Sequence, residues 1–153
     1  MILLSAEQMK YIDNYTTKEL SVPVSVLMHN AANAVIRHIY EGSDNSFLLS
    51  KEDKILVVCG PGNNGCDGLI IADILISKGI DVSVFAPVPF KENTLNDELL
   101  NIYLSNGGLI FDGSDLNQFD AIVDVIFGIG LNRELTGNFK ETIEKLNDAH
   151  ERH

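Results

Sequence analysis

A glycine-rich turn directly after an apolar run limits the folds open to this chain more than any other feature. The stretch VVCGPGNNGCDG covers residues 57–68, and three of its glycines form a G-x-G-x-x-G pattern: Gly60, Gly62 and Gly65. The preceding run, residues 55–59, is short, apolar and β-branched, which is typical of a strand covered on both faces. Residues 67–78 then show helical periodicity and end at Gly79. The stretch therefore predicts a strand, a tight turn and a helix.

The same alternation continues along the chain. We expect further strands at residues 80–85, 109–111 and 121–127, and further helices at 94–105 and 139–146. Two helices precede them, one opened by a Ser5–Gln8 capping box and one opened by Pro23. Strands that alternate with helices imply a parallel sheet between helical layers. We expect one α/β domain over residues 1–153, a three-layer α/β/α Rossmann-like sandwich with a mainly parallel sheet and two N-terminal helices.

Composition excludes several classes of partner. The chain has 22 acidic and 11 basic residues, a net charge of −11, and no basic cluster, so we expect no nucleic-acid partner. No run approaches the ~20 apolar residues of a membrane span. Cys59 and Cys66 are seven residues apart, which fits neither a C-x-x-C redox pair nor a zinc site. Two such thiols suggest a reducing compartment, so we expect a cytoplasmic protein.

Two acidic residues argue against ordinary dinucleotide binding at the glycine turn. A dinucleotide site needs an acid at the carboxyl end of the second strand, about 20 residues on, to hold the ribose. Asp81 has the spacing but lies at the amino end of that strand. Asp67 lies at the expected helix N-terminus, where its charge would repel a diphosphate. The turn is therefore interpreted as a polar or cation-coordinating loop.

The polar residues of this turn also have simpler interpretations. Asp67 is equally well explained as a helix N-cap. Asn63 and Asn64 are common in turns, since asparagine tolerates left-handed backbone angles. Cys66 is explained as a small packing residue, because no base lies near it in sequence.

Asp124 is harder to explain structurally. It interrupts the apolar run AIVDVIF, residues 121–127, whose valines predict a buried strand. A buried, unpaired carboxylate is costly, so such acids often mark functional sites; the alternative is a carboxylate capped by loop amides. A second glycine turn, residues 128–133, follows and contains Arg133, which could meet a phosphate. Both glycine turns should border one crevice at the carboxyl ends of the strands.

These motifs together resemble one family. GPGNNGCDG resembles the GPGNNGGDG signature of the NAD(P)H-hydrate epimerase family, the YjeF N-terminal domain. The similarity extends to LSAEQMKYID at 4–13, LMHNAANAV at 27–35 and DVIFGIGLNRELTG at 124–137. The resemblance implies a Rossmann-like sandwich that interconverts the R and S epimers of hydrated NADH and NADPH, whose nicotinamide ring carries a hydroxyl at C6.

The resemblance also implies site residues. It assigns substrate binding to Asn63, Asn64, Gly65, Cys66, Asp67, Gly128, Ile129, Gly130, Leu131, Asn132, Arg133 and Glu134. Asn64 and Asp124 match the ligands of a potassium ion, the expected cofactor. Asp124 is also expected to act as the catalytic proton-handling group. The ligand would then be a damaged dinucleotide whose nicotinamide end meets the first glycine turn.

The chain departs from the family pattern at three places. His29 stands where the family usually has glutamate, although a partly exposed histidine is the simpler interpretation. Cys66 replaces a glycine of the signature, which matters if that position needs a positive φ. The family continues into a D-x-P-S-G motif, whereas this chain ends at residues 148–153 without it. The alternative function is therefore a catalytically incomplete nucleotide-binding or scaffolding module of the same fold.

The expected strand order also bears on assembly. The strand around Val57 should be central, with residues 121–127 beside it and no strand beyond. An apolar edge with unpaired backbone groups favours association with another chain. We therefore expect a homo-oligomer, with residues 121–127 at or near the contact.

Overall fold

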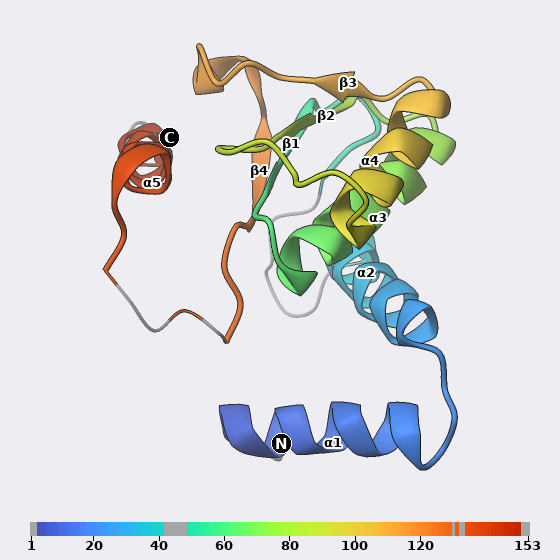
Figure 1. Cartoon of the computed structure of the whole chain (residues 1–153). Helices are drawn as coiled ribbons and strands as arrows, with labels where there is room; N and C mark the ends of the chain where they lie inside the picture. The colour runs from blue at the N-terminus through green and yellow to red at the C-terminus, as the bar shows by residue number, and fades with distance from the viewer. Residues whose placement is uncertain (1–2, 42–48, 130, 132–133, 151–153) are drawn as a thin grey trace.

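Strands and helices alternate along the chain as the hydrophobic periodicity predicts (Figure 1). The computed structural model describes residues 3–41, 49–129, 131 and 134–150. Its elements are α1 (Ala6–Lys18), α2 (Val24–Glu41), β1 (Ile55–Cys59), α3 (Asn63–Ser77), β2 (Val82–Phe85), α4 (Leu95–Ser105), β3 (Leu109–Ile110), the 3-10 helix η1 (Leu116–Gln118), β4 (Ala121–Val125) and α5 (Gly137–His150). All of the expected strands and helices are present, although several boundaries differ.

The four strands form one parallel sheet in the order β3-β2-β1-β4. β1 lies in the middle, where Val57 is opposite Val84 of β2 and Val123 of β4. The α/β fold with a parallel sheet and two N-terminal helices is confirmed. β4 is the last strand of this order, so its outer edge carries no partner strand within the described residues.

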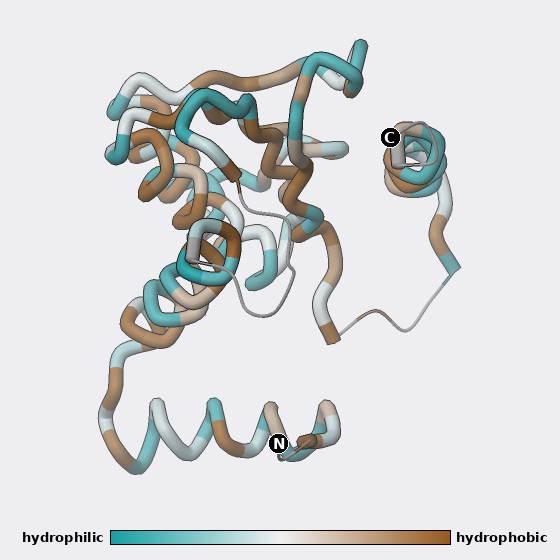
Figure 2. The backbone as a smooth tube through the Cα atoms, turned by 180° about the vertical axis from the view of Figure 1, so that it is seen from behind, coloured by the Kyte–Doolittle hydropathy of each residue, from teal (hydrophilic) through white to brown (hydrophobic). Residues whose placement is uncertain are grey.

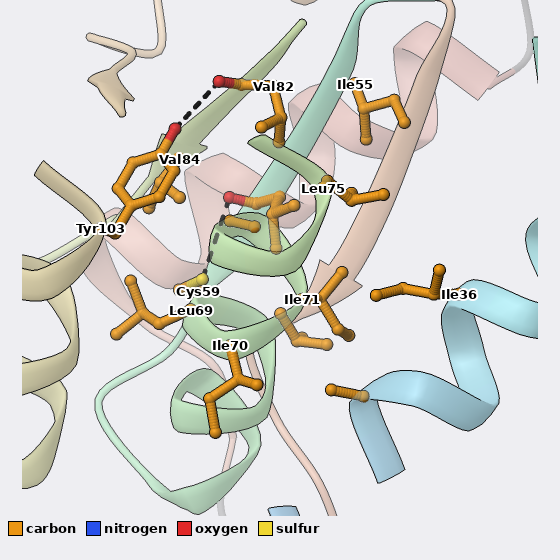
Figure 3. Packing of buried hydrophobic residues seen from close by; sticks show 14 of the residues in the cluster. Ile36, Ile55, Cys59, Leu69, Ile70, Ile71, Leu75, Val82, Val84 and Tyr103 are labelled. Atoms are coloured by element: carbon orange, nitrogen blue, oxygen red, sulfur yellow. Dashed lines mark hydrogen bonds between the residues drawn. The ribbon is translucent and has the colours of Figure 1, made fainter. Parts of the chain in front are cut away.

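Helices cover both faces of the sheet. On one face, α3 packs between α2 and α4, and the side chains of all three join one apolar cluster (Figure 3). On the other face, α5 contributes Phe139, Ile143 and Leu146 to a second cluster. β1 supplies alternate residues to each cluster, Ile55 and Val57 to the first and Leu56 and Val58 to the second. Because both faces of β1 are covered, all five of its residues are apolar and buried.

Local signals in the sequence set several helix ends. Ser5 and Gln8 form the expected capping box at the start of α1. Thr94 caps α4 by accepting a hydrogen bond from the backbone N–H of Asp97. Gly79 follows α3 with φ of +77°, a conformation that only glycine adopts without strain.

None of the helices in the described part of the chain has the length and apolar content needed to cross a membrane.

Tyr103 joins α4 to two strands. Its side chain is fully buried, and its hydroxyl donates to the carbonyl of Val82 at 2.9 Å (Figure 3). The same hydroxyl accepts the backbone N–H of Leu109 at 3.1 Å. One side chain therefore satisfies backbone groups near the starts of β2 and β3.

Tyr103→Phe should lower the free energy of unfolding by about 1–3 kcal/mol, because it leaves buried backbone groups without partners. Urea denaturation of the full chain measures this change. Tyr11→Phe is the matched control, since Tyr11 is exposed on α1. Equal stability of the two variants would contradict the role assigned to the Tyr103 hydroxyl.

Candidate functional site

The turn between β1 and α3 lies directly against the end of β4. A Cβ atom added to Gly60 would lie 1.8 Å from the carbonyl oxygen of Ile126. A Cβ atom added to Gly65 would lie 1.7 Å from the carbonyl oxygen of Gly60. Side chains cannot occupy either place, so glycine at these two positions allows the turn to fold onto itself and onto β4. The expectation that the two glycine turns border one crevice is consistent with this approach.

Helix α3 also packs closely against the strands at Gly68. A Cβ atom on Gly68 would meet the side chains of Val125 at 2.3 Å and Cys59 at 2.8 Å. Cys66 lies within α3, and the non-glycine residues with positive φ in the described part of the chain are Ser21 and Asn93. Cysteine at position 66 therefore fits the backbone without strain.

Asn96 holds the turn in place from α4. It is 5% exposed, and its amide Nδ2 donates to the carbonyl oxygens of Gly62 at 3.1 Å and Gly60 at 3.4 Å. The sequence analysis did not single out this residue. Its position in the sequence could have indicated this role. Asn96 lies in the first turn of α4, just after the N-cap Thr94, and the start of that helix should face the expected crevice.

The two asparagines lie in the first turn of α3 rather than in the preceding loop. The predicted start at residue 67 is wrong, because the helix begins at Asn63 with Gly62 as its N-cap. Gly62 provides no side-chain hydrogen bond, so the first N–H groups of α3 have no side-chain cap. A Cβ atom added to Gly128 would lie 3.6 Å from the side chain of Asn64. The first glycine turn therefore lies close to the second.

Asp67 is a partly buried carboxylate within α3. It lies five residues after the N-cap Gly62, so the N-cap interpretation is wrong. Its Oδ1 is buried and has no hydrogen-bond partner in the described structure. Burial, and secondly the charge of Asp13 on α1, raise the pKa of Asp67 to about 6. Asp13 was not expected near the site, because sequence alone does not show where α1 lies.

The two cysteines are packing residues. Both are buried free thiols. Burial, with the charge of Asp67 as a lesser cause, raises the pKa of Cys66 to about 11. Burial also raises the pKa of Cys59 to about 12. Neither thiol is a nucleophile at neutral pH, which agrees with the interpretation of Cys66 as a small packing residue.

Asp124 is exposed, so the prediction that it lies in a buried strand is wrong. The reason is its place on β4, the edge strand, where a cleft of about 290 Å³ separates the strand from α5. Asp124, Ile122 and Leu146 are among the residues that line this cleft. Asp124 Oδ1 accepts the backbone N–H of Ile126 at 3.0 Å. The alternative of a carboxylate capped by loop amides is therefore the observed arrangement.

The second glycine turn is only partly described. Gly128, Ile129, Leu131 and Glu134 are exposed, and the N–H of Leu131 donates to the carbonyl of Gly128 at 3.4 Å. Gly130, Asn132 and Arg133 lie outside the described residues.

His29 is exposed, and its Nδ1 donates to the carbonyl of Ser25 at 2.8 Å. A partly exposed histidine was the simpler interpretation, and the structure agrees with it.

Asn64 in α3 and Asp124 in β4 offer oxygen ligands rather than the nitrogen and sulfur ligands typical of transition metals. Within the described residues, Asn64 Oδ1 and Asp124 Oδ2 have no hydrogen-bond partner, and no hydrogen bond joins the two side chains. No group of three or more His, Cys, Asp or Glu side chains in the described part could hold a metal ion. Amide, carboxylate and carbonyl oxygens are hard ligands, which hard cations prefer.

Comparison with known proteins identifies the family. Residues 24–152 match the family described as YjeF-related protein N-terminus. The chain belongs to the YjeF N-terminal family. The solved structure titled "Crystal structure of yeast ynu0, YNL200c" superimposes with a TM-score of 0.79 at 25% identity, covering 99% of this chain and 67% of the yeast chain.

Curated relatives in bacteria are more similar. The chain is 34% identical over 151 residues to the NAD(P)H-hydrate epimerase of Oenococcus oeni, covering 97% of this chain and 69% of that protein. It is 36% identical over 148 residues to the NAD(P)H-hydrate epimerase of Leuconostoc citreum, covering 96% of this chain and 64% of that protein. The chain therefore spans about two thirds of the length of the curated relatives it matches.

Gly65→Ala should destabilise the YjeF N-terminal fold by about 3 kcal/mol or more, because its Cβ would overlap backbone rather than a movable side chain. Gly62→Ala is the matched control. Nothing lies within 4 Å of its Cβ position, and it should cost less than about 1 kcal/mol. Thermal unfolding of both variants measures the difference. Similar melting temperatures would show that the turn does not need its close approach.

Asp67→Asn should stabilise the protein at pH 7.5 by about 1–2 kcal/mol, a value reduced for the partial exposure of the carboxylate. The folded-state pKa of about 6 lies above the reference value of 3.8, so folding favours the protonated acid. The cost of Asp67 is therefore absent below pH 3.8 and grows as pH rises through 6. Urea denaturation at about pH 4 and pH 7.5 measures it. A pH-independent difference would contradict the raised pKa.

Proposed function

We propose that this protein is an NAD(P)H-hydrate epimerase, an isomerase that interconverts the R and S forms of hydrated NADH and NADPH. Support comes from relatives of that name at 34–36% identity over nearly the whole chain.

We also propose that it acts in the cytoplasm, since Cys59 and Cys66 are free thiols. With its net charge of −11, the protein has no expected nucleic-acid partner.

The close approach of the two glycine turns carries this proposal. Asn64 lies against Gly128, at the carboxyl ends of β1 and β4, where open α/β sheets bind ligands. The turns would surround a small molecule with amide groups, uncapped helix N–H groups and exposed apolar residues. The proposed substrate-binding residues are Asn63, Asn64, Gly65, Cys66, Asp67, Gly128, Ile129, Gly130, Leu131, Asn132, Arg133 and Glu134.

The reaction follows from the structure of the substrate. The hydroxyl-bearing carbon C6 is also bonded to the ring nitrogen. When the hydroxyl takes up one proton, it leaves as water, and the nitrogen lone pair forms an iminium with C6. Water then adds to the opposite face of C6 and gives up one proton, which restores the hydrate as its other epimer. A carboxylate near the iminium lowers the barrier by stabilising its positive charge.

The two acids are suited to different parts of this reaction. Asp67, with a pKa of about 6, is partly protonated at neutral pH and can donate a proton to the leaving hydroxyl. Asp124 has one oxygen held by the N–H of Ile126, which fixes the carboxylate and leaves the other oxygen to accept a proton. We propose Asp124 as the catalytic base.

We propose potassium as the cofactor, held by Asn64 and Asp124. Both side chains offer oxygens that have no hydrogen-bond partner in the described residues, and Asn64 lies next to Gly128 of the second glycine turn. When bound, the ion would supply positive charge that orients the substrate and the carboxylate. The turn and the strand end would provide the remaining oxygens.

A catalytically incomplete nucleotide-binding or scaffolding module of this fold is the second candidate. The exposure of Asp124 favours it, because acid–base groups usually act where water is excluded. The two candidates differ in turnover. A scaffolding module would bind the hydrated dinucleotide without changing the ratio of its epimers.

Asp124→Asn should reduce epimerisation at least about 100-fold, the usual effect of removing an acid–base group. The fold should be unchanged, because Asp124 is exposed. NMR of the two C6 epimers measures the rate. Asp120→Asn, an exposed acid just before β4, is the matched control and should retain the native rate.

A second measurement tests the ion without relying on activity. The melting temperature of the native chain should be higher in potassium chloride than in sodium chloride, and Asp124→Asn should abolish the difference. Native turnover in Asp124→Asn would exclude Asp124 as the base. An unchanged potassium effect in that variant would place the ion elsewhere.

A further inference from the structure

The tip of the β1–α3 turn is exposed, although the elements on both sides of it are buried. Pro61, Gly62 and Asn63 are exposed, whereas β1 is fully buried and α3 is mostly buried from Gly65 onwards. The strongly hydrophobic part of the chain is in the strands and α3 (Figure 2). Apolar packing therefore fixes β1 and the body of α3, but it cannot fix the tip that joins them. The tip leads directly into the proposed substrate-binding residues of α3.

Hydrogen bonds hold this turn instead. The N–H of Gly60 donates to the carbonyl of Val125 at 3.1 Å, which ties the start of the turn to β4. The carbonyls of Gly60 and Gly62 accept from Nδ2 of Asn96 at 3.4 and 3.1 Å. Gly60, Pro61 and Gly62 have no polar side chain, so they cannot supply such a bond themselves. Among the described residues, Asn96 is the one whose side chain donates to these carbonyls.

Asn96 is suited to this role by its amide and by its place in α4. Two carbonyl oxygens face the side chain, so only the NH₂ group of the amide can lie against them. The start of α4 is itself firmly held, because Thr94 caps it and the N–H of Asn93 donates to the carboxylate of Asp97 at 3.1 Å. α4 lies beside α3 (Figure 1). The bonds from Asn96 therefore join a fixed helix to the exposed turn.

Holding the Gly62 carbonyl also orients the residues that follow. In a planar trans peptide the N–H points opposite to the C=O, and the described chain has no cis peptide bond. The Gly62 carbonyl accepts from Asn96 and from the N–H of Cys66, the latter at 3.2 Å. Its direction sets that of the Asn63 N–H and of the first turn of α3. Asn64, which lies beside the second glycine turn, is in that first turn.

We propose that Asn96 is a positioning residue for substrate binding, which holds the β1–α3 turn in the arrangement that receives the hydrated dinucleotide. The inference rests on the proposed epimerase function, and Asn96 takes no part in the chemistry because its buried amide faces the backbone. Such a residue sets the fraction of molecules whose turn is ready to bind. Its loss raises the apparent dissociation constant by the reciprocal of that fraction. Reactivity of the bound complex is unchanged, since the turn is ordered there.

Asn96→Ala should raise KM for the hydrate about tenfold and keep kcat within about twofold of the native value, because two lost hydrogen bonds lower the fraction of ordered turn. NMR of the two C6 epimers over a range of substrate concentrations separates KM from kcat. Alanine preserves α4, since it favours a helix and leaves the Thr94 cap in place. Circular dichroism checks that the variant is folded.

Asn106→Ala is the matched control. Asn106 is also an asparagine of the α4 region, and its Nδ2 donates to Oδ1 of Asp73 in α3 at 2.8 Å. It therefore joins the same two helices, but at the C-terminal end of α4, away from the β1–α3 turn. This variant should keep the native KM. An equal rise of KM in both variants would show a general loosening of α4 and overturn the proposal.

Asn96→Asp separates hydrogen bonding from packing. The carboxylate has nearly the same shape as the amide, but it places an oxygen against the carbonyls of Gly60 and Gly62 and can donate nothing when ionised. KM should therefore rise at least as much as in Asn96→Ala. A native KM in Asn96→Asp would show that the position needs only a side chain of this size, and the positioning role would be wrong.

Amide hydrogen exchange tests the turn without relying on activity. The N–H of Cys66 donates to the Gly62 carbonyl, so its exchange reports how well that carbonyl is held. Asn96→Ala should speed this exchange about tenfold, and Asn106→Ala should leave it unchanged. Unchanged exchange at Cys66 in Asn96→Ala would show that Asn96 does not hold the turn.

The remaining outcomes separate this inference from the proposed function. Faster exchange with a native KM in Asn96→Ala would overturn the positioning role and leave the epimerase proposal intact. A lower kcat with a native KM would do the same, because it indicates less folded enzyme. If the native chain shows no turnover, calorimetry with hydrated NADPH measures binding directly, and Asn96→Ala should weaken it about tenfold. Absence of binding by the native chain would overturn both proposals.

Discussion

The contact between the backbone of the β1–α3 turn and the end of β4 determines much of the architecture. Gly60 lies against the carbonyl of Ile126, and Gly65 lies against Gly60, in places where no side chain fits. This approach sets α3 directly on the sheet and brings Asn64, in the first turn of α3, to Gly128. Asn96 then fixes the turn from α4 through two hydrogen bonds. The position of the candidate site is therefore determined mainly by the packing of the backbone, and the polar side chains add to it.

The two acids of the proposed site show how the environment gives identical carboxyl groups different properties. Asp67 is on a helix pressed against the sheet, with a buried oxygen and the charge of Asp13 nearby, so its pKa rises to about 6. Asp124 is on the edge strand, exposed, and held by a backbone N–H. One carboxyl group is therefore suited to carrying a proton near neutral pH and the other to remaining in a fixed orientation. This division would suit the proposed epimerisation, which removes and replaces water at one carbon.

The outer edge of β4 has no partner strand within the described residues. The edge formed by β4 carries acidic residues, Asp124 within the strand and Asp120 just before it, which oppose pairing with a second copy of the same strand.

The sequence determined the fold class and the order of elements, because apolar periodicity and glycine position reflect local backbone preferences and burial on one or both faces. It also indicated both glycine turns, since each follows an apolar strand. The exposure of Asp124 was decided only in three dimensions: its neighbours are valines, but burial of β4 depends on how α5 packs beside it. The early start of α3, the clamp by Asn96 and the effect of Asp13 on Asp67 were likewise set by contacts between residues distant in the chain. Such contacts leave no periodic signal, because they depend on the placement of whole elements rather than on local sequence.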